Sequence, residues 1–426
     1  MDFIEELRQR GMIHDLMPGT QEQLCKGVTA GYIGFDPTSD SLHIGNLVQI
    51  MTLVHFQRAG HKPIALVGGA TGMVGDPSGK SQERNLLDMD TLRGNQEGIT
   101  RELQKFLDFD CGDNSAEVVN NYDWFGEMRF LDFIRDTGKH IPINYMLAKD
   151  SVKTRMETGM SFTEFSYQLV QGYDFYHLNK HHGCMIQLGG SDQWGNIVTG
   201  TELIRRMGGG EAFAVTTPLI KKADGTKFGK TESGAVWLNK DKTSVRDFYQ
   251  YWLNASDEDA STYTRIFSLK NIKEIEVIES KHAEDPGKKL LQKELGKEIT
   301  IRVHSQADYD ALGLESNIMF DRSISKSELG SMGQTEFEKA IASFDFVNID
   351  HKEGTGLLEF LAGTTGVYSS NGEARRALQG NAVAINKEKI REDFQIEDKD
   401  WLYGVYMIIS KGKKKHIIVN RGGKGD

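Results

Sequence analysis

The stretch from Thr29 to Asn46 constrains the fold most strongly, because its pattern indicates a buried strand that turns into a helix. The strand is expected at residues 29–35, and Pro37 ends it because proline has no N–H for the ladder. Apolar residues at helical spacing predict a helix over about residues 42–59, with Gly60 as its C-terminal cap. The first turn of such a helix exposes N–H groups and partial positive charge, which favours an anion.

A second apolar strand, expected at residues 62–67, follows the helix and ends in a glycine-rich loop at residues 68–80. The two strands and their helix form a βαβ unit, which implies a parallel sheet. Ligands of such sheets bind at the carboxyl ends of the strands. The loop is one residue short of a P-loop, and it lacks a G-x-G-x-x-G pattern. The glycines could serve only to give the backbone room to turn. We interpret the segment as a ligand-binding loop, because it contains Asp76 and Lys80 and is followed by Arg84.

A capping box opens a helix expected over residues 161–178, in which Tyr167, Gln171 and Asp174 share one face. Such a polar face usually contacts solvent. Here the other faces carry large apolar residues, so the helix is expected to be enclosed and the polar face to line a pocket. A third short strand, at residues 185–188, ends in the segment GGSDQWGN and again turns into a helix.

The chain has 426 residues, enough for two or three domains. The expected fold class is α/β, with a Rossmann-like parallel-sheet catalytic domain. We expect this domain at residues 1–235, including an exposed lysine-rich loop at 221–234. A helical domain (236–330), a linker (331–352) and a small α+β domain (353–426) are expected to follow.

Charge and cysteine content narrow the classes of function. The net charge of −10 argues against nucleic-acid binding by the surface as a whole. Residues 411–416, however, are strongly basic and can form a local binding patch. No apolar run reaches the ~20 residues of a membrane span, and the acidic N-terminus is not a signal peptide, so we expect a cytosolic protein. The three cysteines form no C-x-x-C pair, and the histidines at 181–182 lack a second ligand cluster, so no metal site is predicted.

Two short motifs, His43-Ile44-Gly45-Asn46 and Lys227-Phe228-Gly229-Lys230-Thr231, resemble the HIGH and KMSKS signatures of class I aminoacyl-tRNA synthetases. Either alone occurs by chance, but their order and the βαβ context of the first strengthen the pair. The segments GYIGFDPT, GGATGMVGDPSG, SFTEFSY, GGSDQWGN and KADGTKFGKTESGAVWL resemble the bacterial tyrosyl-tRNA synthetases. Residues 353–420 resemble an RNA-binding domain of the ribosomal-protein-S-four type. Asn46 replaces the second histidine of HIGH, and KMSKS is reduced to KFGKT.

The resemblance implies that the chain joins L-tyrosine to tRNA(Tyr) in two steps. Tyrosine would attack the α-phosphate of ATP, giving tyrosyl-adenylate and pyrophosphate, and the tyrosyl group would then move to the terminal adenosine of the tRNA. ATP would bring Mg²⁺, and no prosthetic group is expected. The family also implies a homodimer, whose contact we expect in the apolar region 124–165.

The family's site residues carry over to the matching positions of this sequence. Tyrosine would be bound by Tyr32 and Asp174 at its phenol, by Asp76, Tyr167 and Gln171 at its ammonium group, and by Gln193 near its carboxylate. ATP would be bound by Asp36, Gly45, Gly190, Asp192 and Lys230. The catalytic contacts to ATP phosphates and departing pyrophosphate would come from Thr38, His43, Asn46, Lys80, Arg84, Lys227, Lys230 and Thr231.

Three alternatives remain at this point. A tryptophanyl-tRNA synthetase would have the same fold, but an indole N–H needs only an acceptor, whereas Tyr32 and Asp174 supply a donor and an acceptor. A non-catalytic RNA-binding relative would not need His43, Lys227 and Lys230. A nucleotidyltransferase acting on small molecules would not need the C-terminal RNA-binding domain.

Overall fold

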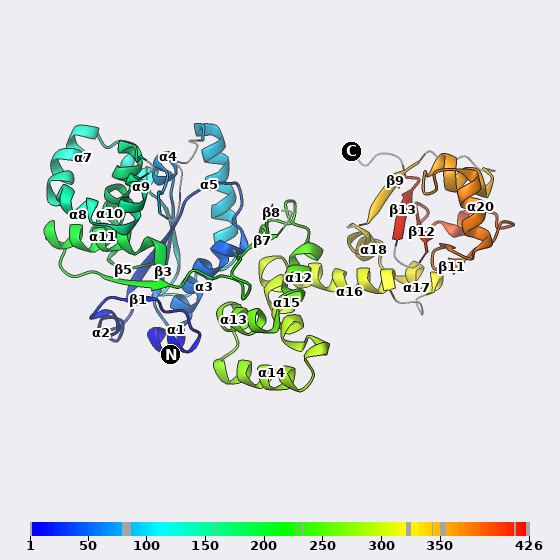
Figure 1. Ribbon diagram of the computed structural model, residues 1–426, viewed down its shortest axis with the longest axis horizontal. Coiled ribbons are helices and arrows are strands. Elements are labelled where there is room, and N and C mark those ends of the chain that lie inside the picture. Colours follow the sequence, from blue (N-terminus) through cyan, green and yellow to red (C-terminus); the bar gives the residue numbers. More distant parts are fainter. Residues whose placement is uncertain are drawn as a thin grey trace. The chain divides into compact units, whose positions relative to one another are not determined.

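The computed structural model describes residues 2–78, 87–157, 159–226, 228–231, 234–320, 325–342, 344–349, 355–412 and 415–422. The chain divides into two compact units, Met1–Thr243 with Asp247–Val303, and Ser244–Arg246 with His304–Asp426 (Figure 1). Within the described ranges, no helix has the length and apolar character needed to cross a membrane. Lys80, Arg84 and Lys227 lie outside the described residues.

The strands are β1 (Asp15–Leu16), β2 (Ala30–Phe35), β3 (Lys62–Val67), β4 (Glu117–Asn120), β5 (Cys184–Gly190), β6 (Phe213–Thr217), β7 (Lys230–Thr231), β8 (Gly234–Ala235), β9 (Asp345–Asn348), β10 (Val383–Ile385), β11 (Glu388–Lys389), β12 (Tyr406–Lys411) and β13 (Lys415–Asn420). The first ten helices are α1 (Phe3–Gln9), α2 (Thr20–Leu24), α3 (Ile44–Arg58), α4 (Thr71–Val74), α5 (Met89–Leu103), α6 (Tyr122–Phe125), α7 (Phe130–Asp136), α8 (Ile143–Leu147), α9 (Asp150–Met156) and α10 (Phe162–His182). The later helices are α11 (Trp194–Arg206), α12 (Val245–Leu253), α13 (Asp257–Phe267), α14 (Ile272–Glu284), α15 (Leu290–Val303), α16 (Gln306–Phe320), α17 (Lys326–Ser331), α18 (Gln334–Ile341), α19 (Leu357–Glu359) and α20 (Asn371–Gln379).

The sheet of the first unit has the strand order β1-β6-β5-β2-β3-β4, with β1 antiparallel to β6 and the other neighbours parallel. The predicted parallel sheet is therefore present. The chain leaves β2 through α3 and returns to β3 on one side, while β5 lies on the other side of β2. This change of direction between β2 and β5 is where open parallel sheets bind their ligands.

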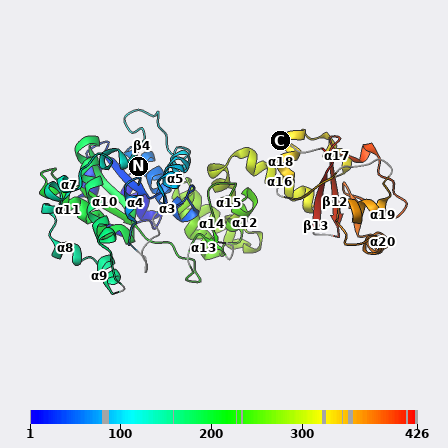
Figure 2. The ribbon, with the colours of Figure 1, turned by 90° about the horizontal axis from the view of Figure 1, so that it is seen from above.

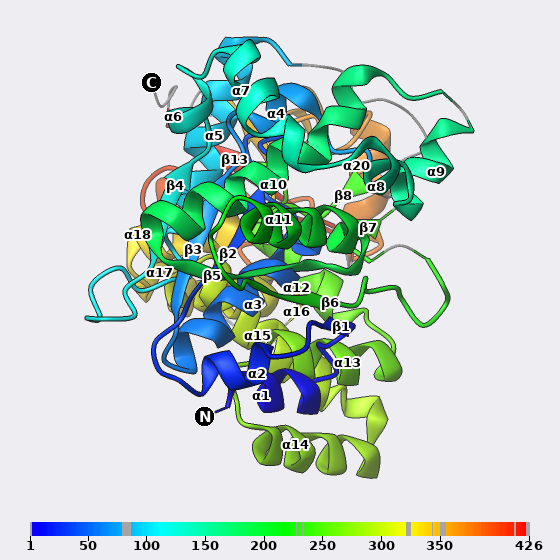
Figure 3. The ribbon, with the colours of Figure 1, turned by 90° about the vertical axis from the view of Figure 1, so that its left-hand side faces the viewer.

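Alternation along β2 assigns its side chains to the two faces of the sheet. Ile33 and Phe35 enter the core shared with α3, whereas Tyr32 packs with Phe175 of α10, with ring centroids 5.4 Å apart. α10 and α11 cover the face that Tyr32 occupies, and α3 covers the other (Figure 3). Helix α3 is buried on most sides because α1 and α13 also pack against it. The sequence had suggested a single apolar stripe for this helix.

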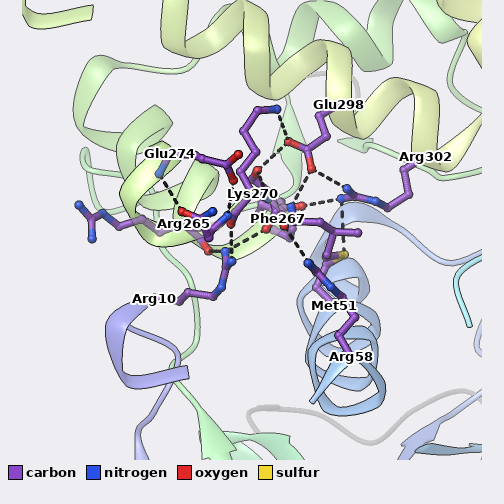
Figure 4. A network of polar contacts seen from close by, with 12 residues as sticks. Arg10, Met51, Arg58, Arg265, Phe267, Lys270, Glu274, Glu298 and Arg302 are labelled. Atoms are coloured by element: carbon purple, nitrogen blue, oxygen red, sulfur yellow. Dashed lines mark hydrogen bonds and ion pairs between the residues drawn. The ribbon is translucent and has the colours of Figure 1, made fainter. Parts of the chain in front are cut away.

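Arginine side chains, among them the buried Arg10, join the helices of Asp247–Val303 to the N-terminal part of the same unit (Figure 4). The guanidinium of Arg10, 2% exposed, pairs with Glu6 at 2.6 Å and donates to the carbonyl oxygens of Arg265, Ser268 and Lys270. These carbonyls lie at the end of α13, where a helix leaves such groups without internal partners. The bounds of the helical domain expected at 236–330 stay a prediction.

The second unit contains a sheet in the order β11-β10-β12-β13-β9, in which β9 is parallel to β13 and the other pairs are antiparallel. Successive residues of β12 and β13 alternate between two layers of helices, one on each face of the sheet. Ile408 and Ile418 pack with α17 and α18, whereas Met407 and Val419 pack with α19 and α20. Figure 2 shows these helix pairs on opposite sides of β12 and β13.

Candidate active site

A cavity of about 600 Å³ opens at the carboxyl ends of β2 and β5. It brings together most of the residues predicted from the sequence: Tyr32, Asp36, Thr38, His43, Gly45, Asn46, Asp76, Tyr167, Gln171, Asp174, Gly190, Asp192, Gln193 and Lys230. Lys80, Arg84 and Lys227 are outside the described residues, and for Thr231 only the backbone position in β7 is described. The roles of these residues stay predictions.

The inner end of the cavity holds a phenol and a carboxylate. Tyr32 and Asp174 are each 1% exposed, and no hydrogen-bond partner of the Tyr32 hydroxyl occurs among the described residues. A buried hydroxyl without a partner costs free energy, which a ligand can recover by accepting its hydrogen bond. Asp174 in turn accepts hydrogen bonds from Asn121 Nδ2 at 3.0 Å and Trp124 Nε1 at 2.9 Å.

Asn121 and Trp124 were not predicted as site residues. Both lie just beyond β4, so the rule that ligand groups follow the carboxyl ends of parallel strands could have found them. Their donors hold both carboxylate oxygens of Asp174 in place. Burial raises the pKa of Asp174 to about 8, although the hydrogen bonds from Asn121 and Trp124 oppose that rise.

The raised pKa of Asp174 predicts a loss of stability with rising pH. The folded state holds this proton more tightly than the unfolded chain, so the contribution is complete below pH ~4 and disappears as pH rises through about 8. The Asp174→Asn variant has no titrating group at this position. Relative to it, wild type should lose on the order of 1 kcal/mol of unfolding free energy per pH unit between pH ~4 and about 8. Urea unfolding of both chains at pH 5, 6, 7 and 8 measures the difference; equal pH dependence would contradict it.

Asp36, at the end of β2, is held by two hydroxyl groups. Its Oδ2 accepts from the Tyr167 hydroxyl at 2.9 Å and its Oδ1 from Thr71 Oγ1 at 2.7 Å. A Cβ on Gly68 would lie 2.2 Å from Asp36 Oδ1, so only glycine lets the loop approach so closely. Tyr167, which is predicted to bind the ammonium group of tyrosine, therefore also hydrogen-bonds Asp36, which is predicted to bind ATP.

Asp76 forms a second polar group on the cavity wall. Its Oδ2 accepts from Gln193 Nε2 at 2.7 Å, and its Oδ1 accepts from the backbone N–H of Ser78 at 2.9 Å. Asp76 comes from the glycine-rich loop and Gln193 from the turn after β5, so the contact joins two predicted ligand segments. An ammonium group placed here would meet carboxyl oxygens that can accept its hydrogen bonds.

The two signature motifs contact each other through the backbone. His43 is the N-cap of α3, and its N–H donates to Asn46 Oδ1 at 3.1 Å. The Ile44 N–H donates to the Val236 carbonyl at 2.9 Å, and the Val236 N–H donates to the Gly229 carbonyl at 3.1 Å. The segment that follows the second motif therefore pairs with the start of α3, and Asn46 replaces a histidine at a position that caps the helix.

Phe228 anchors the second motif in an aromatic cluster. The ring is 6% exposed and lies 4.9 Å from Tyr263 and 5.7 Å from Phe267, centroid to centroid. The next residue, Gly229, has φ +80° and donates its N–H to the Tyr251 hydroxyl at 3.2 Å. This contact fixes the backbone directly before Lys230, which lines the cavity.

Phe228→Ala is expected to lower the free energy of unfolding of the first unit by about 3–5 kcal/mol, the range for removing a large buried ring. Thermal unfolding followed by tryptophan fluorescence measures the loss. Phe109→Ala makes the same change at a ring that is 37% exposed and should cost less than about 1 kcal/mol. Similar losses in the two variants would contradict an anchoring role.

Comparison with known proteins identifies the family of this chain. The family described as class I tRNA synthetases (W and Y) matches residues 26–321, and the SYY-like C-terminal domain of tyrosine–tRNA ligases matches residues 336–419. The tyrosine–tRNA ligase of Cytophaga hutchinsonii is 54% identical over 98% of this chain and 99% of its own length. The chain belongs to the class I tyrosine–tRNA ligase family. The ligase of Flavobacterium johnsoniae is 52% identical, with the same two coverages.

Solved structures of this family show the same fold. A C-terminally truncated mitochondrial tyrosyl-tRNA synthetase from Aspergillus nidulans superposes with a TM-score of 0.66 and 30% identity. The match covers 75% of this chain and 94% of that one. Membership of the tyrosine–tRNA ligase family makes the chain an aminoacyl-tRNA synthetase, and the tryptophanyl and non-catalytic alternatives are not favoured.

Proposed function

We propose that the cavity at the ends of β2 and β5 activates L-tyrosine with ATP and then transfers the tyrosyl group to tRNA(Tyr). The observation that carries this proposal is the buried pair at its inner end. A substrate phenol there would accept from the unpartnered Tyr32 hydroxyl and donate to Asp174. The outer part of the same cavity contains His43 and the start of α3, which suits ATP phosphates.

Within this proposal, each part of the cavity has one task. Asp76, Tyr167 and Gln171 bind the ammonium group, and Gln193 lies near the carboxylate. Asp36, Gly190 and Asp192 bind the ribose. The ATP phosphates and departing pyrophosphate are contacted by Thr38, His43, Gly45, Asn46, Lys80, Arg84, Lys227, Lys230 and Thr231.

The first step needs no protein nucleophile, because the tyrosine carboxylate itself attacks the α-phosphate. The bond from that phosphate to the bridging oxygen breaks, and pyrophosphate leaves with the electron pair. The protein's contribution is to align the two substrates and to stabilise charge on the phosphate oxygens. Mg²⁺ would arrive with the ATP phosphates. Among the described residues, no three His, Cys, Asp or Glu side chains gather to hold a metal ion.

The C-terminal domain is assigned to RNA. We place the phosphate contacts on the basic residues 411–416, of which Lys411 ends β12 and Lys415 begins β13. Lys411 pairs with Glu373 at 2.8 Å, so an RNA phosphate would compete with that carboxylate. The reaction is proposed to take place in the cytosol, where the tRNA substrate is available.

A homodimer is also part of the proposal. Its support is a group of exposed apolar side chains within 124–165, among them Phe130 (64% exposed), Ile143 (65%) and Phe162 (66%). Exposed apolar groups of this kind are typical of an association surface. Sedimentation equilibrium should give twice the chain mass, and a monomer at all micromolar concentrations would contradict it.

Amino-acid-dependent exchange between ATP and pyrophosphate tests the proposed function. Tyrosine should support exchange, whereas tryptophan and phenylalanine should not, because neither satisfies Tyr32 and Asp174 together. Exchange with tryptophan instead of tyrosine would favour the alternative synthetase. Absence of exchange with any amino acid, combined with tRNA binding, would favour the non-catalytic relative.

A further inference from the structure

One face of α5 lies along the turn that leads into the first signature motif. Asn95, Gly98 and Glu102 are three and then four residues apart, the spacing of neighbours on one side of a helix. Asn95 and Glu102 are each 7% exposed, although both are polar. Buried polar groups need partners, so the contacts of this face indicate what it holds.

All three residues meet the turn at residues 37–42. Asn95 Nδ2 donates to the Pro37 carbonyl at 3.0 Å. The Glu102 carboxylate accepts from the Ser41 hydroxyl at 2.7 Å and from the Leu42 N–H at 2.7 Å. The turn is thus fixed at its beginning by one side chain and at its end by another.

Gly98 explains how the helix reaches the middle of the turn. A Cβ at this position would lie 2.0 Å from the carbonyl oxygen of Asp40, a distance that no side chain can occupy. The turn would have to move away from α5 if Gly98 carried any side chain. Ile99, the next residue, lines the cavity, so α5 forms part of its wall.

We propose that the Asn95–Gly98–Glu102 face of α5 holds the turn at residues 37–42 in the position that the reaction with ATP requires. Glu102 is the principal positioning residue of this face. The turn carries Thr38 at its start and leads directly into His43, the N-cap of α3. Both residues line the ATP side of the cavity, whereas Asp174 and Tyr32 lie on other elements. Displacing the turn should therefore impair the ATP step and spare tyrosine binding.

The inference rests on the proposed function and goes beyond it, because α5 itself need not touch either substrate. A misplacement of about 1 Å can cost about 100-fold in rate, so Glu102→Ala and Gly98→Ala should slow adenylate formation by about that factor. Glu102→Gln should stay within about fivefold of wild type. Its amide oxygen can accept from Leu42, and its Nε2 can donate to the Ser41 oxygen while that hydroxyl donates to the Leu42 carbonyl, which already lies 3.0 Å away.

Gly94→Ala is the matched control, since it makes the same substitution on the same helix where an added Cβ has no atom within 4 Å. It should match wild type in rate and unfold at the same or a slightly higher temperature. The experiment measures single-turnover adenylate formation, the dissociation constant of tyrosine by equilibrium dialysis, and thermal unfolding for all four variants. The expected result is a loss in rate for Glu102→Ala and Gly98→Ala with tyrosine affinity within about threefold of wild type.

Adenylate formation near the wild-type rate in Glu102→Ala and Gly98→Ala would overturn the inference. An equal loss of tyrosine affinity and of adenylate rate would also overturn it, because it would show that the substitutions disturb the whole site and not the turn alone. A comparable slowing in Gly94→Ala or in Glu102→Gln would show that the contacts to the turn are not responsible. Failure of the proposed function itself is distinguished by wild type, which would then form no adenylate with tyrosine.

Discussion

Replacement of Asp174 by alanine is expected to lower kcat/KM for tyrosine by about 1000-fold in ATP–pyrophosphate exchange. The variant loses the acceptor for the phenol, so the O–H of a bound tyrosine would be buried without a partner. A hydrogen bond contributes about 0.5–1.5 kcal/mol, and a stranded buried donor costs about 1–3 kcal/mol. Their combined effect of about 4 kcal/mol corresponds to the stated factor.

Asp123→Ala provides the matched control for this experiment. Asp123 is exposed on α6 and directly precedes Trp124, so the same substitution alters the neighbourhood without removing the buried acceptor. This control should keep kcat/KM within about twofold of wild type. The KM for ATP should change little in either variant. A loss below tenfold in Asp174→Ala would exclude the proposed contact with the phenol.

Removal of His304–Asp426 is expected to leave tyrosine activation within about threefold of the full chain and to lower tRNA charging by at least about 100-fold. The first unit keeps its complete sheet and the cavity after this cut. The removed part carries the basic residues 411–416, and neutralising even a few phosphates contributes strongly to RNA affinity. Charging by the full chain should therefore fall steeply with salt, and charging by the truncated chain should not.

The position of the cut determines whether this test can separate a loss of RNA contacts from misfolding of the remaining chain. The domain bounds expected from the sequence place it near residue 350, but β9 pairs with β13, and Phe337 and Ile341 of α18 pack with Ile418. A cut at 350 would expose these apolar groups and confuse misfolding with loss of RNA contacts. A cut after Val303 avoids this problem. Wild-type charging by the shorter chain would refute the division of labour between the two units.

The strand–turn–helix stretch was predictable because its signals are local. Pro37 and the apolar runs gave the strand at 29–35, which the structure places at Ala30–Phe35, and the strand at 62–67 was predicted at its observed bounds. The environment of α3 was not predicted, because periodicity reports apolar positions but not how many neighbours cover them. Helices α1 and α13 both pack against α3, and the spacing of its apolar residues does not indicate either contact.

The candidate site was predictable where a family motif covers it, and less so where a contact depends on distant residues. Asp174 was expected, but its partners Asn121 and Trp124 come from another strand end and match no motif. The contact of Glu102 with Ser41 and Leu42 likewise joins segments that nothing in their local sequence relates. Phe228 was noted only as a departure from KMSKS, since its aromatic neighbours lie on α12 and α13.

In the proposed complex, the amino-acid substrate supplies the hydrogen-bond partner that the buried Tyr32 hydroxyl lacks among the described residues. Without a ligand, the first unit keeps a buried hydroxyl group to which no described residue hydrogen-bonds. A ligand that binds only the folded state stabilises it by about 2.7 kcal/mol at a hundred times its dissociation constant. Resistance of the catalytic unit to proteolysis should therefore track the concentration of free tyrosine, so a supply of the amino acid would also determine how long the protein survives.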